Sequence, residues 1–133
     1  MENIDELHRK YVTLESNIQF YKQEINFLLK ILTKEYSISI TNEKIIKLLD
    51  SYWKEFEKHH NELETLEAEI KKEAHEISSL YKNEEHNIFE YKFDEKKLFN
   101  NYSKIISSLM ILKERLYNYM ESDMKHKLTL TLL

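Results

Sequence analysis

The apolar residues of this chain recur in alternating steps of three and four positions. Such spacing places a continuous apolar stripe along one face of an α-helix, and its persistence over several heptads is typical of long helical bundles and coiled coils. The first series predicts a helix over about residues 3–36, whose stripe must be buried against other helices. Its members are Ile4, Leu7, Tyr11, Leu14, Ile18, Tyr21, Ile25, Leu28 and Leu32.

Two further series continue the same helical period. The second predicts a helix over about residues 43–82, and Thr41 or Asn42 can cap its amino-terminal end. The third predicts a helix over about residues 88–126. The members of the second series are Ile45, Leu49, Tyr52, Phe56, His59, Leu63, Leu66, Ile70, Glu73, Ile77 and Leu80, and those of the third are Ile88, Tyr91, Glu95, Leu98, Tyr102, Ile105, Leu109, Leu112, Leu116 and Tyr119.

The chain has no glycine, proline or cysteine among its 133 residues. Two-residue β-hairpins and phosphate-binding loops depend on glycine, whereas disulfide scaffolds and zinc ribbons depend on cysteine. The length fits one domain. The sequence therefore predicts a single all-α domain over residues 1–133.

The connection between the second and third helices falls at residues 83–87. Leu80, Glu84 and Ile88 are spaced four and four, so the heptad register slips there. A turn would make an antiparallel hairpin, and a stutter would leave one continuous helix. We expect the turn, because it lets one chain bury both stripes, and hence an antiparallel up-down-up three-helix bundle. The alternatives are continuous second and third helices, or a four-helix bundle in which the third helix breaks at Asn100-Asn101.

The last residues, 128–133, alternate leucine with threonine. A period of two is typical of extended chain rather than helix. Residues 37–40 alternate in the same way, so we expect a short extended tail that pairs with them or with its own copy in a second subunit. The alternative is a free peptide that docks into a partner.

Two polar residues, His59 and Glu73, stand at positions of the second apolar series. Single polar residues in a helical core often fix register and partner orientation at some cost in stability. We expect His59 to be half-buried and bonded to a tyrosine or carboxylate on a facing helix. Glu73 should pair with a lysine or arginine of another helix or extend its carboxylate to water.

A metal site would have to use Glu57, His60 and Glu64, which form one E-x-x-H and one H-x-x-x-E pattern. Ferritin-like bundles need an E-x-x-H on each of two helices and two further glutamates. Only one such pattern is present, and Glu57 and His60 lie off the apolar series. We therefore expect no metal and no other cofactor, with a metal- or ligand-binding bundle centred on His59 and His60 as the alternative. No nucleophile constellation emerges, so we expect no enzyme.

The charges exclude several classes of partner. The net charge is −4, and Arg9 and Arg115 are the only arginines, so the chain lacks the basic surface of a nucleic-acid-binding protein. The amino terminus does not resemble a secretory signal, and the apolar runs are too short to cross a bilayer. We expect a cytoplasmic protein that contacts neither nucleic acid nor membrane.

More apolar residues are present than three stripes can bury. A large exposed apolar patch on a soluble protein usually marks an interaction site. We therefore expect a non-enzymatic scaffold or adaptor that binds protein partners or itself, as a homodimer, through an apolar end of the bundle. The residues expected at this interface are Phe20, Phe27, Ile31, Met110, Tyr117 and Met120.

One segment of the first helix resembles known sequences. Residues 20–27 read F-Y-K-x-E-I-x-F, where x stands for Gln23 and Asn26. This pattern resembles a segment of small, uncharacterised helical coiled-coil proteins of Bacteroidetes, and the resemblance covers about a quarter of the chain. It implies a helical fold and brings no activity or site residues with it.

Overall fold

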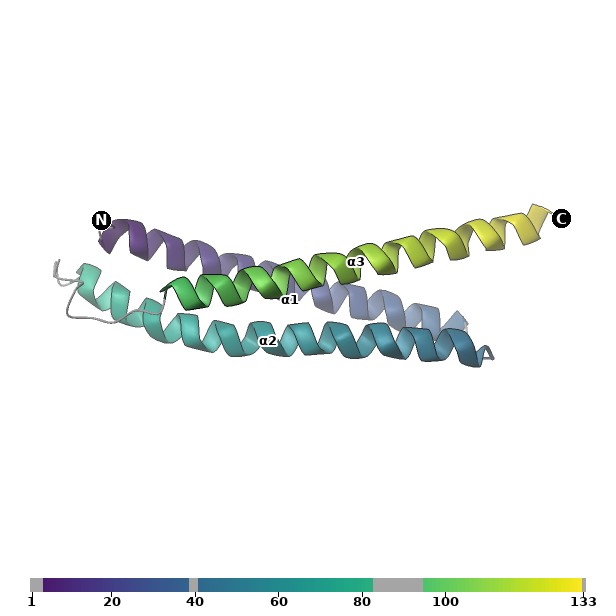
Figure 1. The fold of residues 1–133 in the computed structure, drawn as a ribbon, viewed down its shortest axis with the longest axis horizontal. Coiled ribbons are helices and arrows are strands. Elements are labelled where there is room, and N and C mark those ends of the chain that lie inside the picture. Colours follow the sequence, from purple (N-terminus) through teal and green to yellow (C-terminus); the bar gives the residue numbers. More distant parts are fainter. Residues whose placement is uncertain (1–3, 39–40, 83–94, 133) are drawn as a thin grey trace.

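The computed structural model consists of three long α-helices that lie side by side (Figure 1). They are α1 (Ile4–Ile38), α2 (Glu43–Lys82) and α3 (Glu95–Leu132). The structure describes residues 4–38, 41–82 and 95–132. Within these ranges there is no β-strand, and α2 packs against both other helices. The predicted all-α three-helix bundle is therefore confirmed.

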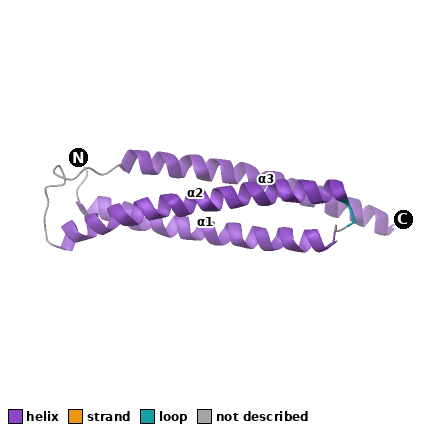
Figure 2. Cartoon of the chain, turned by 90° about the horizontal axis from the view of Figure 1, so that it is seen from below, coloured by secondary structure: helices purple, strands orange, loops and turns teal. Residues whose placement is uncertain are grey.

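The helices alternate in direction along the chain. The amino terminus of α1 and the carboxyl terminus of α2 lie at the same end of the bundle (Figures 1 and 2). The carboxyl-terminal part of α3 lies at the opposite end. The up-down-up arrangement excludes a continuous α2–α3 helix. The predicted turn at 83–87 and the expected start of the third helix at 88–94 lie outside the described residues. Because α3 is unbroken through residues 100–101, the four-helix alternative is also wrong.

The core follows the three apolar series. Large side chains such as Tyr11 and Phe56 are completely buried. The buried apolar residues come from all three helices and form one cluster, so the stripes close on one another. They are Ile4, Leu7, Tyr11, Leu14, Ile18, Ile25, Leu28, Leu32, Leu49, Phe56, Leu63, Leu66, Ile70, Ile77, Leu80, Leu98, Ile105, Leu109, Leu112 and Leu116.

Local contacts define the start of α2 and join it to the end of α1. The Asn42 side-chain oxygen accepts a hydrogen bond from the Ile45 amide at 3.2 Å, and the Asn42 carbonyl accepts one from the Ile46 amide at 3.0 Å. Asn42 is therefore the amino-terminal cap of α2. Across the connection, the Tyr36 hydroxyl donates to the Asp50 carboxylate. Burial, reinforced by Asp50, raises the pKa of Tyr36 to about 12.

The carboxyl-terminal residues differ from the sequence-based expectation. Helix α3 continues to Leu132, so residues 128–132 are helical and the predicted extended tail is wrong for them. Leucine is a strong helix former, and threonine costs only about 0.7 kcal/mol or less per residue relative to alanine. A helix also satisfies its backbone groups locally, whereas an extended segment needs a partner strand. Figure 1 shows this end of α3 extending beyond the carboxyl-terminal end of α1 and the amino-terminal end of α2.

Replacement of Asn42 by alanine should destabilise the bundle by about 1 kcal/mol, because the first turn of α2 loses its cap. Urea unfolding followed by circular dichroism measures the change. Asn26→Ala is the matched control, since Asn26 is exposed in the middle of α1 and alanine has the higher helix propensity. Equal effects of the two substitutions would contradict the capping role.

Candidate functional site

The face formed by α1 and α3 carries the largest exposed apolar side chains of the predicted interface. The exposed fractions are 58% for Phe20, 61% for Phe27, 45% for Met110 and 49% for Tyr117. We call these four residues the α1–α3 patch. The other two predicted interface residues, Ile31 and Met120, are partly buried and pack against the core.

The α1–α3 patch surrounds an ion pair between the two helices. Lys113 Nζ contacts Glu24 Oε1, and the side chains of these two residues are only 16% and 20% exposed. Phe20 and Phe27 lie four residues before and three residues after Glu24, whereas Met110 and Tyr117 lie three before and four after Lys113. Residues three or four apart share a helix face. The four apolar side chains therefore lie on the side of the bundle where α1 meets α3.

Aromatic rings connect α1 and α3 beneath and beside this patch. The Phe20 ring meets Tyr21 edge-on at 5.3 Å between ring centroids, and Tyr21 contacts Tyr102 of α3 at 6.4 Å. Nearer the amino terminus, Tyr11 meets Phe99 edge-on at 6.2 Å. Large side chains rather than close backbone packing thus fill the space between α1 and α3. The patch is the outer layer of this aromatic contact.

A polar cluster joins α1 to α2 on another side of the bundle. Glu67, only 9% exposed, accepts a hydrogen bond from the Gln19 amide and lies 3.4 Å from the ammonium groups of both Lys22 and Lys71. Glu67 follows Leu66 and lies outside the three-four series, so the apolar period does not predict its burial. The available signal was its place beside the stripe, where coiled coils commonly hold interhelical ion pairs.

The two predicted core polar residues are both placed between helices, but their partners differ from the predicted ones. His59 is 8% exposed, and its Nδ1 lies 3.3 Å from Glu62 Oε1. The carboxylate next to it is therefore on α2 itself, one turn away, and neither His59 Nδ1 nor Glu62 Oε1 makes a hydrogen bond among the described residues, so the predicted bond to a facing helix is wrong. Glu73 accepts a hydrogen bond from the hydroxyl of the fully buried Tyr11 in α1. A tyrosine of another helix is thus one partner of Glu73, a contact that the apolar period did not predict.

The structure brings together two of the three residues of the possible metal site. His60 Nδ1 lies 3.7 Å from Glu64 Oε1, and the same oxygen lies 3.8 Å from Lys22 Nζ. The Glu64 carboxylate thus already has a cationic neighbour in the Lys22 ammonium. Glu57 instead lines a groove on the α2–α3 side. No group of three or more histidine, aspartate or glutamate residues among the described residues could hold a metal ion.

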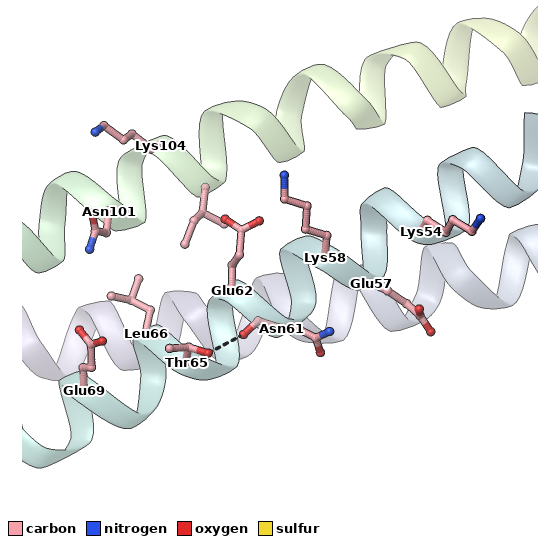
Figure 3. Close-up of a pocket in the computed structure, with 11 residues that line it drawn as sticks. Lys54, Glu57, Lys58, Asn61, Glu62, Thr65, Leu66, Glu69, Asn101 and Lys104 are labelled. Atoms are coloured by element: carbon pink, nitrogen blue, oxygen red, sulfur yellow. Dashed lines mark hydrogen bonds between the residues drawn. The ribbon is translucent and has the colours of Figure 1, made fainter.

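The groove between α2 and α3 has a volume of about 720 Å³ (Figure 3). Leu66 and Ile105 form its apolar floor, and Figure 3 shows Lys58 and Glu62 projecting from α2 toward α3. Thr65 donates its hydroxyl proton to the Asn61 carbonyl at 3.1 Å and is not activated by a base. The remaining lining residues are Lys54, Glu57, Glu69, Asn101 and Lys104, so the groove is lined by charges of both signs.

Comparisons of the chain with protein-family models, with curated proteins and with solved structures find no match. Among the described residues, no helix is both long and apolar enough to cross a membrane.

Replacement of Tyr11 by phenylalanine should cost about 1–2 kcal/mol of unfolding free energy, because Glu73 loses its interhelical donor. A double-mutant cycle with Glu73→Gln isolates the contribution of the pair, since the cost of Tyr11→Phe should shrink when the carboxylate is absent. Tyr117→Phe is the control, because that ring is half exposed. Equal costs of Tyr11→Phe in both backgrounds would show that the contact contributes no coupling energy.

Replacement of His60 by alanine should leave the melting temperature nearly unchanged and alter no metal content. His60 contacts one carboxylate at the surface, and such exposed pairs contribute about 0–1 kcal/mol. Elemental analysis of protein purified without an affinity tag provides the measurement. Stoichiometric iron, zinc or manganese that disappears on His60→Ala would overturn this expectation.

Proposed function

We propose that this protein is a non-enzymatic helical scaffold or adaptor that associates with itself, as a homodimer, or with another protein through the α1–α3 patch. The observation that supports the proposal is the grouping of Phe20, Phe27, Met110 and Tyr117 around one largely buried ion pair. Large aromatic and sulfur-containing side chains are typical of the centres of protein interfaces. Here they lie along the side of the bundle, rather than at one of its ends.

The energetic basis of the association is burial of apolar surface. Each of the two exposed phenylalanines would contribute up to about 1.5–3 kcal/mol if it became fully buried. Beneath them, Lys113 already neutralises Glu24, so a partner would cover a compensated pair rather than an isolated charge. Nucleic acid is a poor fit to a chain in which 24 acidic residues outnumber 20 basic ones.

Ligand binding centred on His59 and His60 has less support. The imidazole of His59 is buried against Glu62, and His60 lies among Glu64 and the Lys22 ammonium that Glu64 attracts. Among the described residues, neither ring belongs to a group of three or more histidine, aspartate or glutamate side chains that could hold a metal ion. The α1–α3 patch therefore carries the functional proposal.

The double substitution Phe20→Glu/Phe27→Glu should give a folded monomer, because two buried carboxylates would oppose assembly. Both side chains are more than half exposed, so the helical content should be preserved. Multi-angle light scattering after size exclusion reports the mass, and circular dichroism reports the fold.

Val12→Glu is the matched control, since Val12 is a 53% exposed apolar residue of α1 outside the patch. It should leave the assembly intact. A double variant that associates as strongly as the unchanged protein would contradict the role of the patch.

A further inference from the structure

We propose that the partner bound by the α1–α3 patch is a second copy of this chain, and that a two-fold axis parallel to the helices places α1 of each copy against α3 of the other. This inference rests on the proposed function and adds the identity and orientation of the partner. It follows from the distribution of charge beside the patch.

Helices α1 and α3 run in the same direction and are matched in height. Lys10 pairs with Glu95 at 3.2 Å near the start of α3, and Glu24 pairs with Lys113 further along both helices. Residues beyond Glu24 on α1 therefore lie at the level of residues beyond Lys113 on α3. The patch and the charges that follow it occupy the same segment of the bundle.

The outward stripe of α1 is basic beyond its phenylalanines. Lys30 and Lys34 follow Phe27 by three and seven residues, so they continue the line of Phe20 and Phe27 along one helix face. Both lysines are exposed. Within the described ranges neither has an ion-pair partner. This stripe consists of Phe20, Gln23, Phe27, Lys30 and Lys34, and it carries no carboxylate.

The outward stripe of α3 is acidic over the same length. Glu114 follows Met110 by four residues, and Glu121 follows Tyr117 by four, so all four residues share one face of α3. Both glutamates are exposed. The α3 stripe of Met110, Glu114, Tyr117 and Glu121 therefore alternates apolar and acidic residues, and it has no basic residue.

A two-fold axis parallel to the helices brings these unlike stripes together. The α1 stripe of one copy then faces the α3 stripe of the other at the same height, and symmetry repeats the contact. Phenylalanines meet Met110 and Tyr117 of the second copy, while Lys30 and Lys34 approach Glu114 and Glu121 of that copy. Methionine–aromatic and opposite-charge contacts are both favourable.

The antiparallel two-fold arrangement lacks this complementarity. It would place α1 against α1 and α3 against α3, so that the lysines would face a stripe without carboxylates and the glutamates a stripe without bases. The face is complementary to itself only in the parallel arrangement, so its charge pattern favours a second copy in that orientation. Electrostatic complementarity of this kind chiefly sets orientation and specificity.

Complementary charge reversal tests the orientation. Lys30→Glu/Lys34→Glu and Glu114→Lys/Glu121→Lys should each weaken self-association at least tenfold at low salt, because every interfacial charge pair becomes repulsive. An equimolar mixture should form a heterodimer with an affinity within about threefold of the unchanged protein, since both reciprocal contacts are then attractive. Sedimentation velocity measures the dissociation constants, and thermal unfolding verifies that each variant is folded.

Lys44→Glu/Lys47→Glu provides the control, because it makes the same charge change on exposed residues of α2. It should change neither the dissociation constant of self-association nor that of heterodimer formation. Suppose that the unchanged protein is dimeric and that the two charge variants bind each other no more tightly than each binds itself. The parallel orientation is then wrong, while the proposed patch stands. If the unchanged protein is monomeric at all concentrations, a second copy is not the occupant and the inference fails.

Discussion

Each helix of this protein must bury one continuous apolar stripe, and the other helices of the bundle supply the surfaces that do so. The stripes persist over whole helices because the chain contains neither glycine nor proline to interrupt them. Helix α2 packs against both α1 and α3, so its stripe is buried between them. Contact between α1 and α3 depends more on large side chains, which leaves phenylalanine, methionine and tyrosine exposed along that side. Burial of the three apolar stripes therefore also determines that the α1–α3 face keeps large apolar side chains exposed.

Polar contacts at three levels fix how the stripes meet. Tyr11 is held by Glu73, Glu67 gathers donors from α1 and α2, and Glu24 joins α1 to α3 through Lys113. Apolar stripes alone tolerate sliding by a heptad, since the same residue types then meet again. A partly buried carboxylate has a defined donor only in one alignment, and leaving it unpaired is costly. These contacts set the relative heights of the helices and thus the height at which the outward stripes of α1 and α3 face a partner.

Periodicity predicted the elements well. The predicted second helix, 43–82, coincides with α2, and the first, 3–36, differs from α1 by one or two residues at its ends. Periodicity also placed His59 in the interior and four of the six interface residues on the surface. It failed at residues 128–132, where the leucine–threonine alternation predicts extended chain. The helix that precedes these residues continues through them instead.

The partners of polar residues could not be predicted in the same way. The sequence indicates which face a residue occupies, but its partner across the interface depends on the axial offset between helices. Sequence period alone therefore did not predict that Glu73 contacts Tyr11, or that His59 lies next to a carboxylate of its own helix. Glu67 was missed because it lies beside the stripe rather than on it. The partner of a polar residue depends on the axial offset between helices, whereas its burial depends mainly on its place in the apolar period of its own helix.

Small-angle X-ray scattering over a range of protein concentrations tests the side-by-side association most directly, because it measures mass and length in one experiment. Lateral pairing of two bundles at the same height predicts that the mass rises from 16.3 kDa to twice that value. The maximum dimension should then stay close to that of one bundle, while the cross-section increases. A mass of one chain at all concentrations, or a doubled mass with a markedly longer particle, would contradict association through the α1–α3 face.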